Sequence, residues 1–279
     1  MKRWPVAVLL LSVLVASESC AQSGAPGAGA AARRDSTRQG LHFIYMIRHG
    51  WYDADDPRDE RVGKGLDSLG RQQARLTGER LAALPIHIDR VVSSTFTRAA
   101  QTGDDIAAIL HMPVERDSDL CECQPISARE DYNRMLQPGE SDACIAQLTR
   151  VWARYFTPVT GSADRHDVLV AHGNVTRWLL TRALGIDSKR WSDFSIGNGS
   201  ITAFIVRPDG SVTLAAWSDT GHLPANLQTW TGRGAGWSPP PPRRNAAAAP
   251  VMTPGPSGVS MPAPAAARDT LRLSRPTHR

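Results

Sequence analysis

Two histidines and two arginines stand at or just after the ends of three apolar, strand-like runs of the chain. Arg48 and His49 end the first run, Arg98 follows the second, and His172 ends the third. Guanidinium groups present a fixed fork of donors that suits phosphate oxygens, and they stay charged at neutral pH. A neutral imidazole is a competent nucleophile toward phosphorus, and a second imidazole can donate to the phosphate oxygens. These residue types therefore predict phosphoryl-transfer chemistry, which needs mainly positioning and electrostatic stabilisation.

The three apolar runs are predicted to be buried strands, over residues 41–48, 88–93 and 167–172. Segments with helical periodicity lie between and after them: 69–83, 97–110, 141–156 and a stretch that begins after Asn174. Strands that alternate with helices indicate a mainly parallel sheet covered on both faces.

Residues 200–206 and 212–217 flank the turn tripeptide at 208–210 and predict a C-terminal hairpin. The expected fold class is therefore an α/β three-layer sandwich with this hairpin added to the sheet. Ligands of such open sheets bind beyond the carboxyl ends of the strands. The fold would bring the histidines and arginines together there, beside the helix N-terminus that follows Asn174.

At these residues the chain resembles the histidine phosphatase (phosphoglycerate mutase-like) superfamily. The matching motifs are Arg48-His49-Gly50 and residues 66–74, 93–102 and 172–175, and the resemblance covers roughly residues 41–225. Within the superfamily the chain is most similar to the branch of the mitochondrial serine/threonine protein phosphatase. Residues 196–202, 207–210 and 219–224 carry that finer resemblance.

The resemblance implies a role for each residue of the motifs. His49 would attack the phosphoryl group and become phosphohistidine, while Arg48, Arg98, His172 and Asn174 would hold the substrate. The implied activity is metal-independent hydrolysis of phosphomonoesters, with no cofactor. The expected partner is a phosphorylated substrate, either a phosphoprotein or a small phosphate ester.

A carboxylic acid should protonate the leaving oxygen and later activate water. In the resembling branch the acid follows a Leu-x-Glu pattern, which here ends at Glu122. Glu115, Asp117 and Asp119 lie nearby and are the alternatives. The residue after the acid is usually glycine in this branch, whereas Cys123 stands here, which leaves the path of the loop open.

Cys121, Cys123 and Cys144 form an odd set once Cys20 is set aside. In an oxidising compartment one of the close pair could bridge to Cys144 and leave a free thiol. A Cys-x-Cys without companion ligands is weak evidence for zinc, so no metal site is expected. His222 lies near the last matching segment and could line the site.

Residues 1–21 are predicted to be a signal peptide, because a basic start precedes about a dozen apolar residues, fewer than a spanning helix needs. Either the signal is cut after Ala21, or Cys20 is lipid-modified as in bacterial lipoproteins. The expected destination is the periplasm or the medium, with membrane attachment only through a lipid on Cys20.

The remaining regions follow from composition. Residues 22–40 are small and polar and are predicted to be a flexible linker, residues 41–236 a catalytic domain, and residues 237–279 a disordered Pro/Ala/Arg-rich tail. The net charge is +5, but residues 237–279 alone carry six arginines against one aspartate. The basic excess lies outside the domain, so no nucleic-acid surface is expected.

Three alternatives to the phosphohydrolase stay open at this stage. A phosphomutase would use the same phosphohistidine, although the short region between residues 110 and 141 leaves little material for a closed lid. The physiological substrate could be a small phosphate ester. A non-catalytic phosphate-binding scaffold would bind phosphate or vanadate tightly without turnover.

Overall fold

The computed structural model describes residues 38–231, and residues 1–37 and 232–279 lie outside this description. The predicted signal peptide and C-terminal tail therefore fall outside the described residues, as does nearly all of the linker. Within the described part, no helix is long and apolar enough to cross a membrane.

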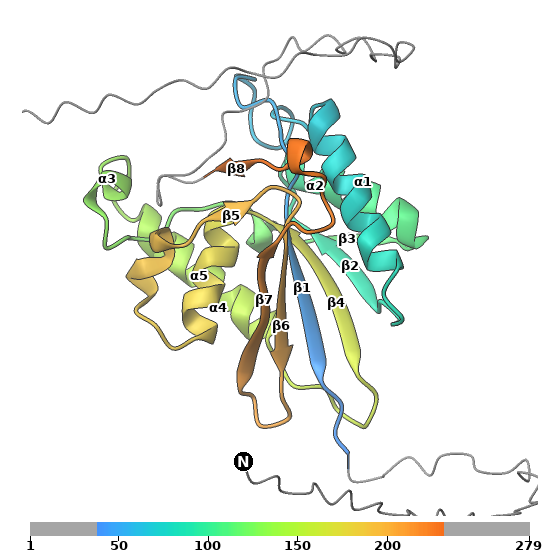
Figure 1. Cartoon of the computed structure of the whole chain (residues 1–279). Helices are drawn as coiled ribbons and strands as arrows, with labels where there is room; N and C mark the ends of the chain where they lie inside the picture. The colour runs from blue at the N-terminus through green and yellow to red at the C-terminus, as the bar shows by residue number, and fades with distance from the viewer. Residues whose placement is uncertain (1–37, 232–279) are drawn as a thin grey trace, which may run out of the picture. The chain divides into compact units, whose positions relative to one another are not determined.

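A six-stranded sheet forms the centre of the molecule, with the strand order β3-β2-β4-β1-β6-β7 (Figure 1). Its strands are β1 (His42–Arg48), β2 (Arg90–Ser93), β3 (Val114–Arg116), β4 (Arg165–Ala171), β6 (Ile201–Val206) and β7 (Val212–Asp219). The first four are mutually parallel, whereas β6 pairs with β1 in the antiparallel direction and β7 pairs antiparallel with β6. The predicted α/β sandwich with a C-terminal hairpin is confirmed.

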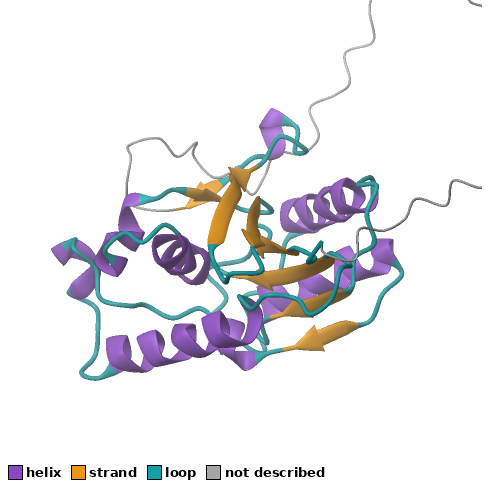
Figure 2. Cartoon of the chain, turned by 90° about the horizontal axis from the view of Figure 1, so that it is seen from below, coloured by secondary structure: helices purple, strands orange, loops and turns teal. Residues whose placement is uncertain are grey.

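Helices cover both faces of this sheet (Figure 2). The helices are α1 (Ser68–Ala82), α2 (Thr97–Leu110), α3 (Glu130–Asn133), α4 (Glu140–Tyr155) and α5 (Gly173–Ala183). Short 3₁₀ turns lie at η1 (Ser118–Leu120), η2 (Ser188–Asp193) and η3 (Ala225–Leu227), and β5 (Ile196–Gly197) pairs with β8 (Trp230–Thr231).

Alternation along β4 divides the core into two layers. Val168 and Val170 pack with the residues of α1 and α2, whereas Leu169 and Ala171 pack with those of α4 and α5. Successive strand residues point to opposite faces, so a strand buried on both sides must be apolar at every position. The unbroken apolar run of the sequence is the consequence of this double burial.

Two glycines, Gly50 and Gly70, allow the backbone at the start of α1 to lie directly against the residues that follow β1. A Cβ atom on Gly70 would lie 1.8 Å from the carbonyl oxygen of Trp51, and one on Gly50 would lie 2.5 Å from the carbonyl oxygen of Gly70. Asp67 caps the same helix by accepting from the amide of Gly70 at 2.9 Å. The helix start therefore holds the backbone on the carboxyl side of His49.

Gly70→Ala should lower the free energy of unfolding by about 1–3 kcal/mol, because a methyl group would be forced into backbone that cannot yield without moving the helix. Urea denaturation of the purified protein measures this. Ser68→Ala is the control, since Ser68 is exposed on the same turn and should change stability by less than about 0.5 kcal/mol. A Gly70→Ala protein as stable as the control would contradict this packing.

Candidate active site

The register of the parallel strands brings the predicted site residues to one edge of the sheet. Arg48 at the end of β1 is paired with Ala171 of β4, so His49 and His172 leave adjacent strands at the same level. Ser93 of β2 is paired with Val170, which places the start of α2 beside them. The two imidazole rings lie 5.1 Å apart between centroids.

These four side chains are buried together. The exposed fractions are 6 % for Arg48, 2 % for His49, 4 % for Arg98 and 0 % for His172. Arg98 Nε donates to His49 Nε2 at 3.2 Å. The structure therefore places two guanidiniums and two imidazoles in one constellation, as the sequence predicted.

The hydrogen bonds of His49 define its tautomer. Arginine can only donate, so Nε2 is the unprotonated nitrogen, while Nδ1 donates to the carbonyl of Gly50 at 2.8 Å. Burial, with the charges of Arg98, His172 and Arg48, holds the pKa of His49 well below its usual range. The ring is thus neutral at physiological pH, with its Nε2 lone pair directed toward the arginine that would bind phosphate.

His172 is held by a hydroxyl. Its Nε2 lies 2.8 Å from Ser94 Oγ. Its buried Nδ1 has no hydrogen-bond partner among the described residues. Burial and the charges of Arg98 and Arg48 lower its pKa well below the usual value.

A cavity of about 350 Å³ opens beside the constellation. It is lined by Arg48, Tyr52, Glu122, Gln124, Asp131, Tyr132, Met135, Gly173, Asn174 and Arg177. Glu122 is the one carboxyl of the predicted acid candidates in this lining. Burial raises its pKa, against the opposing effects of Arg98, Arg177 and Arg48. A carboxyl that keeps its proton near a phosphate site can act as a general acid.

The three alternative acids lie elsewhere. Asp117 pairs with Arg154 and accepts from the Tyr155 hydroxyl, while Asp119 pairs with Arg150. Glu115 is exposed on the edge strand β3. The ion pairs of Asp117 and Asp119 connect η1 to α4, and none of the three carboxylates lines the cavity.

Asn174 holds the acid in place from the first turn of α5. Its amide N–H donates to Glu122 Oε1 at 3.1 Å, and its Nδ2 donates to the carbonyl of Cys123 at 3.0 Å. Arg177 Nη2 donates to Asn174 Oδ1 at 2.6 Å. The helix N-terminus that was expected to face phosphate thus donates to the catalytic candidate Glu122.

Two of the cavity residues that the sequence did not single out lie against the constellation or on the helix that follows His172. Tyr52 lies edge-on to His49 at 5.1 Å, and Arg98 stacks over the Tyr52 ring at 4.7 Å. Arg177 is 5 % exposed and stacks on Trp191 at 4.8 Å. The available signal for Arg177 was its position three residues after Asn174, on the same face of a helix.

The cysteines follow the predicted pattern. Cys123 and Cys144 form a disulfide, and Cys121 is a buried free thiol. The disulfide links Cys123, the residue after Glu122, to α4. The cysteine that stands where the resembling branch usually has glycine therefore has a structural role. Among residues 38–231, no group of three or more potential ligands could hold a metal ion.

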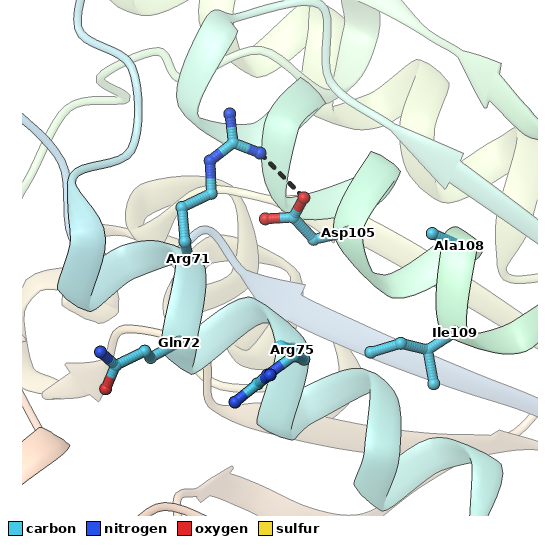
Figure 3. A pocket seen from close by; sticks show the side chains of 6 residues that line it. All are labelled: Arg71, Gln72, Arg75, Asp105, Ala108 and Ile109. Carbon is cyan, nitrogen blue, oxygen red and sulfur yellow. Dashed lines mark hydrogen bonds and ion pairs between the residues drawn. The ribbon is translucent and has the colours of Figure 1, made fainter.

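His222, which the sequence left as a residue that could line the site, is not among the residues that line this cavity. Its Nε2 is 3.1 Å from Thr77 Oγ1, within α1. A second hollow of about 470 Å³ lies between the outer faces of α1 and α2, where Arg71 pairs with Asp105 at 2.8 Å (Figure 3). None of the predicted site residues lines this hollow, whereas Arg48, Glu122 and Asn174 line the smaller cavity, so the chemistry points to the smaller cavity.

Comparison with known proteins places this geometry in a family. The model of the histidine phosphatase superfamily (branch 1) matches residues 44–220. The chain belongs to this superfamily. The predicted resemblance is thereby confirmed, and the Arg48-His49 pair and the His172 segment both lie inside the matched region.

The curated relatives agree with the predicted branch. The mitochondrial serine/threonine-protein phosphatase PGAM5 of mouse is 35 % identical over 193 residues, and that of human is 33 % identical over 191 residues. In both comparisons the match covers 67 % of this chain and 65 % of the relative, so the chain spans just under two thirds of their length. The alpha-ribazole phosphatase of Shigella flexneri has the same fold, with a TM-score of 0.51 at 19 % identity, covering 63 % of this chain and 96 % of that one.

The predicted destination of the chain is wrong. We expected an exported protein with a signal peptide, but the matching relatives are named as mitochondrial proteins. The prediction depended on a basic start and a short apolar run, a pattern of composition that does not by itself specify which targeting machinery reads it. Those residues lie outside the described part of the chain.

Glu122→Gln should lower kcat for an alkyl phosphate by about 10²–10⁴-fold, because the leaving oxygen loses its proton donor. In the wild type, activity should be present below the raised pKa of Glu122 and lost as the pH rises through it, since only the protonated carboxyl can donate. The variant should lack this alkaline limb.

A pH profile of kcat for the two proteins measures both effects. Glu115→Gln is the control, because it neutralises an exposed carboxylate outside the cavity. An alkaline limb that survives in Glu122→Gln would show that another group is the acid.

Proposed function

We propose that the chain is a metal-independent phosphomonoester hydrolase that acts through a phosphohistidine on His49. The main support is the neutral His49, whose Nε2 accepts from Arg98 Nε at 3.2 Å. A second buried imidazole, that of His172, lies beside it. In this mechanism His49 Nε2 attacks phosphorus, and the bond from phosphorus to the leaving oxygen breaks. Glu122 gives its proton to that oxygen.

The second half of the reaction reverses the role of the acid. The Glu122 carboxylate takes a proton from water, the water oxygen attacks the phosphohistidine, and the P–N bond breaks to release inorganic phosphate and free His49. The same group acts as acid and then as base, as successive half-reactions at one phosphorus require. Asn174 acts on this step by holding the carboxyl rather than the substrate, and Arg177 in turn holds the Asn174 side chain.

Arg48, Arg98 and His172 hold the phosphate oxygens in this proposal. Burial and the neighbouring Arg177 lower the pKa of Arg48 to about 10, which still leaves it charged at neutral pH. Arg48 Nη1 donates to the carbonyl of Ile196 at 2.7 Å, which anchors the guanidinium. Fixed donors of this kind stabilise the charge of the transition state without reorganising.

The proposed substrate class is phosphoserine or phosphothreonine in proteins. The names of the PGAM5 relatives favour it. So does the open entrance of the cavity, where Met135 is 76 % exposed beside the short helix α3. Small phosphate esters are the second candidate, because the cavity itself accepts a group of their size. The catalytic unit in this proposal is residues 41–236.

Purified full-length protein should release inorganic phosphate from a phosphopeptide, with or without a chelator. His49→Ala should lower kcat by at least about 10³-fold, since the nucleophile is lost. His87→Ala is the matched control, because it removes an exposed imidazole that does not line the cavity. A panel of phosphoserine and phosphothreonine peptides and small esters measures the preference.

Three other outcomes would contradict the proposed function, and each would indicate a different activity or mechanism. Loss of activity with chelator would contradict the metal-free mechanism. Exchange of phosphate between positions without net release would show a mutase. Tight vanadate binding without hydrolysis would show a phosphate-binding scaffold.

A further inference from the structure

A carboxylate from the segment between β1 and α1 contacts the phosphate-binding arginine. Glu60 Oε2 accepts a hydrogen bond from Arg98 Nη1, and Glu60 Oε1 accepts from Lys64 Nζ at 2.7 Å. Glu60 is 31 % exposed in its side chain, whereas Arg98 is 5 % exposed. No step of the proposed reaction uses this glutamate, so its contact with Arg98 needs its own explanation.

The two contacts of Arg98 lie on different edges of its guanidinium. Nε, which donates to His49 Nε2, shares one edge of the planar fork with Nη2. Nη1, which donates to Glu60, lies on the other side of the fork. A carboxylate at Nη1 therefore leaves the Nε–Nη2 edge directed at His49, which is the pair of donors that suits two oxygens of one phosphoryl group.

Aromatic rings limit the remaining freedom of this guanidinium. The Tyr52 ring centroid lies 4.7 Å from Arg98 Cζ, and the Phe96 ring centroid lies 5.5 Å from it. Stacking restrains the plane of the fork but permits rotation within that plane. The hydrogen bond to Glu60 supplies the restraint against that rotation.

Backbone contacts hold Glu60 independently of its side chain. Its carbonyl accepts from the amide of Thr97 at 2.8 Å and from Thr97 Oγ1 at 3.1 Å. Thr97 directly precedes Arg98 at the start of α2. The segment is therefore fixed to the same helical turn as the arginine, and replacing the Glu60 side chain leaves that attachment intact.

The carboxylate is ionised in this environment. Burial raises the pKa of Glu60, but the hydrogen bonds from Lys64 and Arg98 lower it by more. The pKa therefore lies below its ordinary value. A charged acceptor makes a shorter and stronger hydrogen bond than a neutral one.

We propose that Glu60 is a positioning residue that turns the Nε–Nη2 edge of Arg98 toward the phosphoryl group on His49. This inference rests on the proposed function. It also distinguishes Glu60 from an inhibitory carboxylate that mimics phosphate, because such a group would occupy the Nε–Nη2 edge itself.

Glu60→Ala should lower kcat/KM for a phosphate ester by about 10- to 100-fold, the effect of losing one charge-assisted hydrogen bond. Vanadate affinity, measured by direct calorimetric titration, should fall in the same variant. Glu60→Gln keeps an acceptor oxygen for Nη1 without the charge, so it should recover part of both losses. Glu79→Ala is the control, because it removes an exposed carboxylate from the outer face of α1.

Thermal melting separates positioning from folding. Glu60→Ala should melt within a few degrees of the wild type, since the contacts with Thr97 come from the backbone. Unchanged kcat/KM and vanadate affinity in Glu60→Ala would overturn the proposal. So would tighter vanadate binding in both variants, which would show that Glu60 competes with phosphate.

Vanadate titration keeps this test separate from the test of the reaction. If the wild type binds vanadate but shows no His49-dependent turnover, the proposed hydrolysis fails while the role of Glu60 is still measured by the titration. If turnover is normal and the Glu60 variants are unaffected, only the positioning role fails.

Discussion

The parallel register of β2, β4 and β1 is the constraint on which the site depends. Each strand is buried on both faces, so each must end its apolar run at the sheet edge, and the register brings the three ends level. Several cations meet there: Arg48, Arg98 and Arg177. Burying like charges is costly unless each is hydrogen-bonded or paired. The carbonyls of Ile196 and Gly173 accept from Arg48 and Arg177, and the carboxylate of Glu60 accepts from Arg98.

Burial and the nearby positive charges both determine how the imidazoles behave. Burial disfavours the protonated rings of His49 and His172, and the arginine charges add to this effect, so both pKa values lie well below the usual range. For a nucleophile this is useful, because only the neutral ring can attack phosphorus. Burial acts on Glu122 in the opposite sense, since it favours the neutral acid. Burial at one site thus lowers the pKa of the nucleophile and raises the pKa of the acid.

The strand ends could be predicted from the sequence because they follow from a short-range pattern, an apolar run that stops at a polar residue. The acid at Glu122 needed the family resemblance, since nothing in its local pattern separates it from Asp117 or Asp119. Glu60 and Tyr52 were missed because a loop of irregular backbone brings them to the site, and no periodicity describes such a path. The small elements β5, β8 and α3 were missed for a related reason, as each is too short to show a period.

The proposed reaction depends most directly on a covalent bond between phosphorus and Nε2 of His49. Wild-type protein mixed rapidly with a ³²P-labelled phosphate ester and quenched in alkali, where phosphohistidine survives, should carry label on the peptide that contains His49. The label should disappear on further incubation as water hydrolyses the intermediate, and Glu122→Gln should retain it longer. Release of phosphate at full rate with no label on His49 at any time would contradict the account.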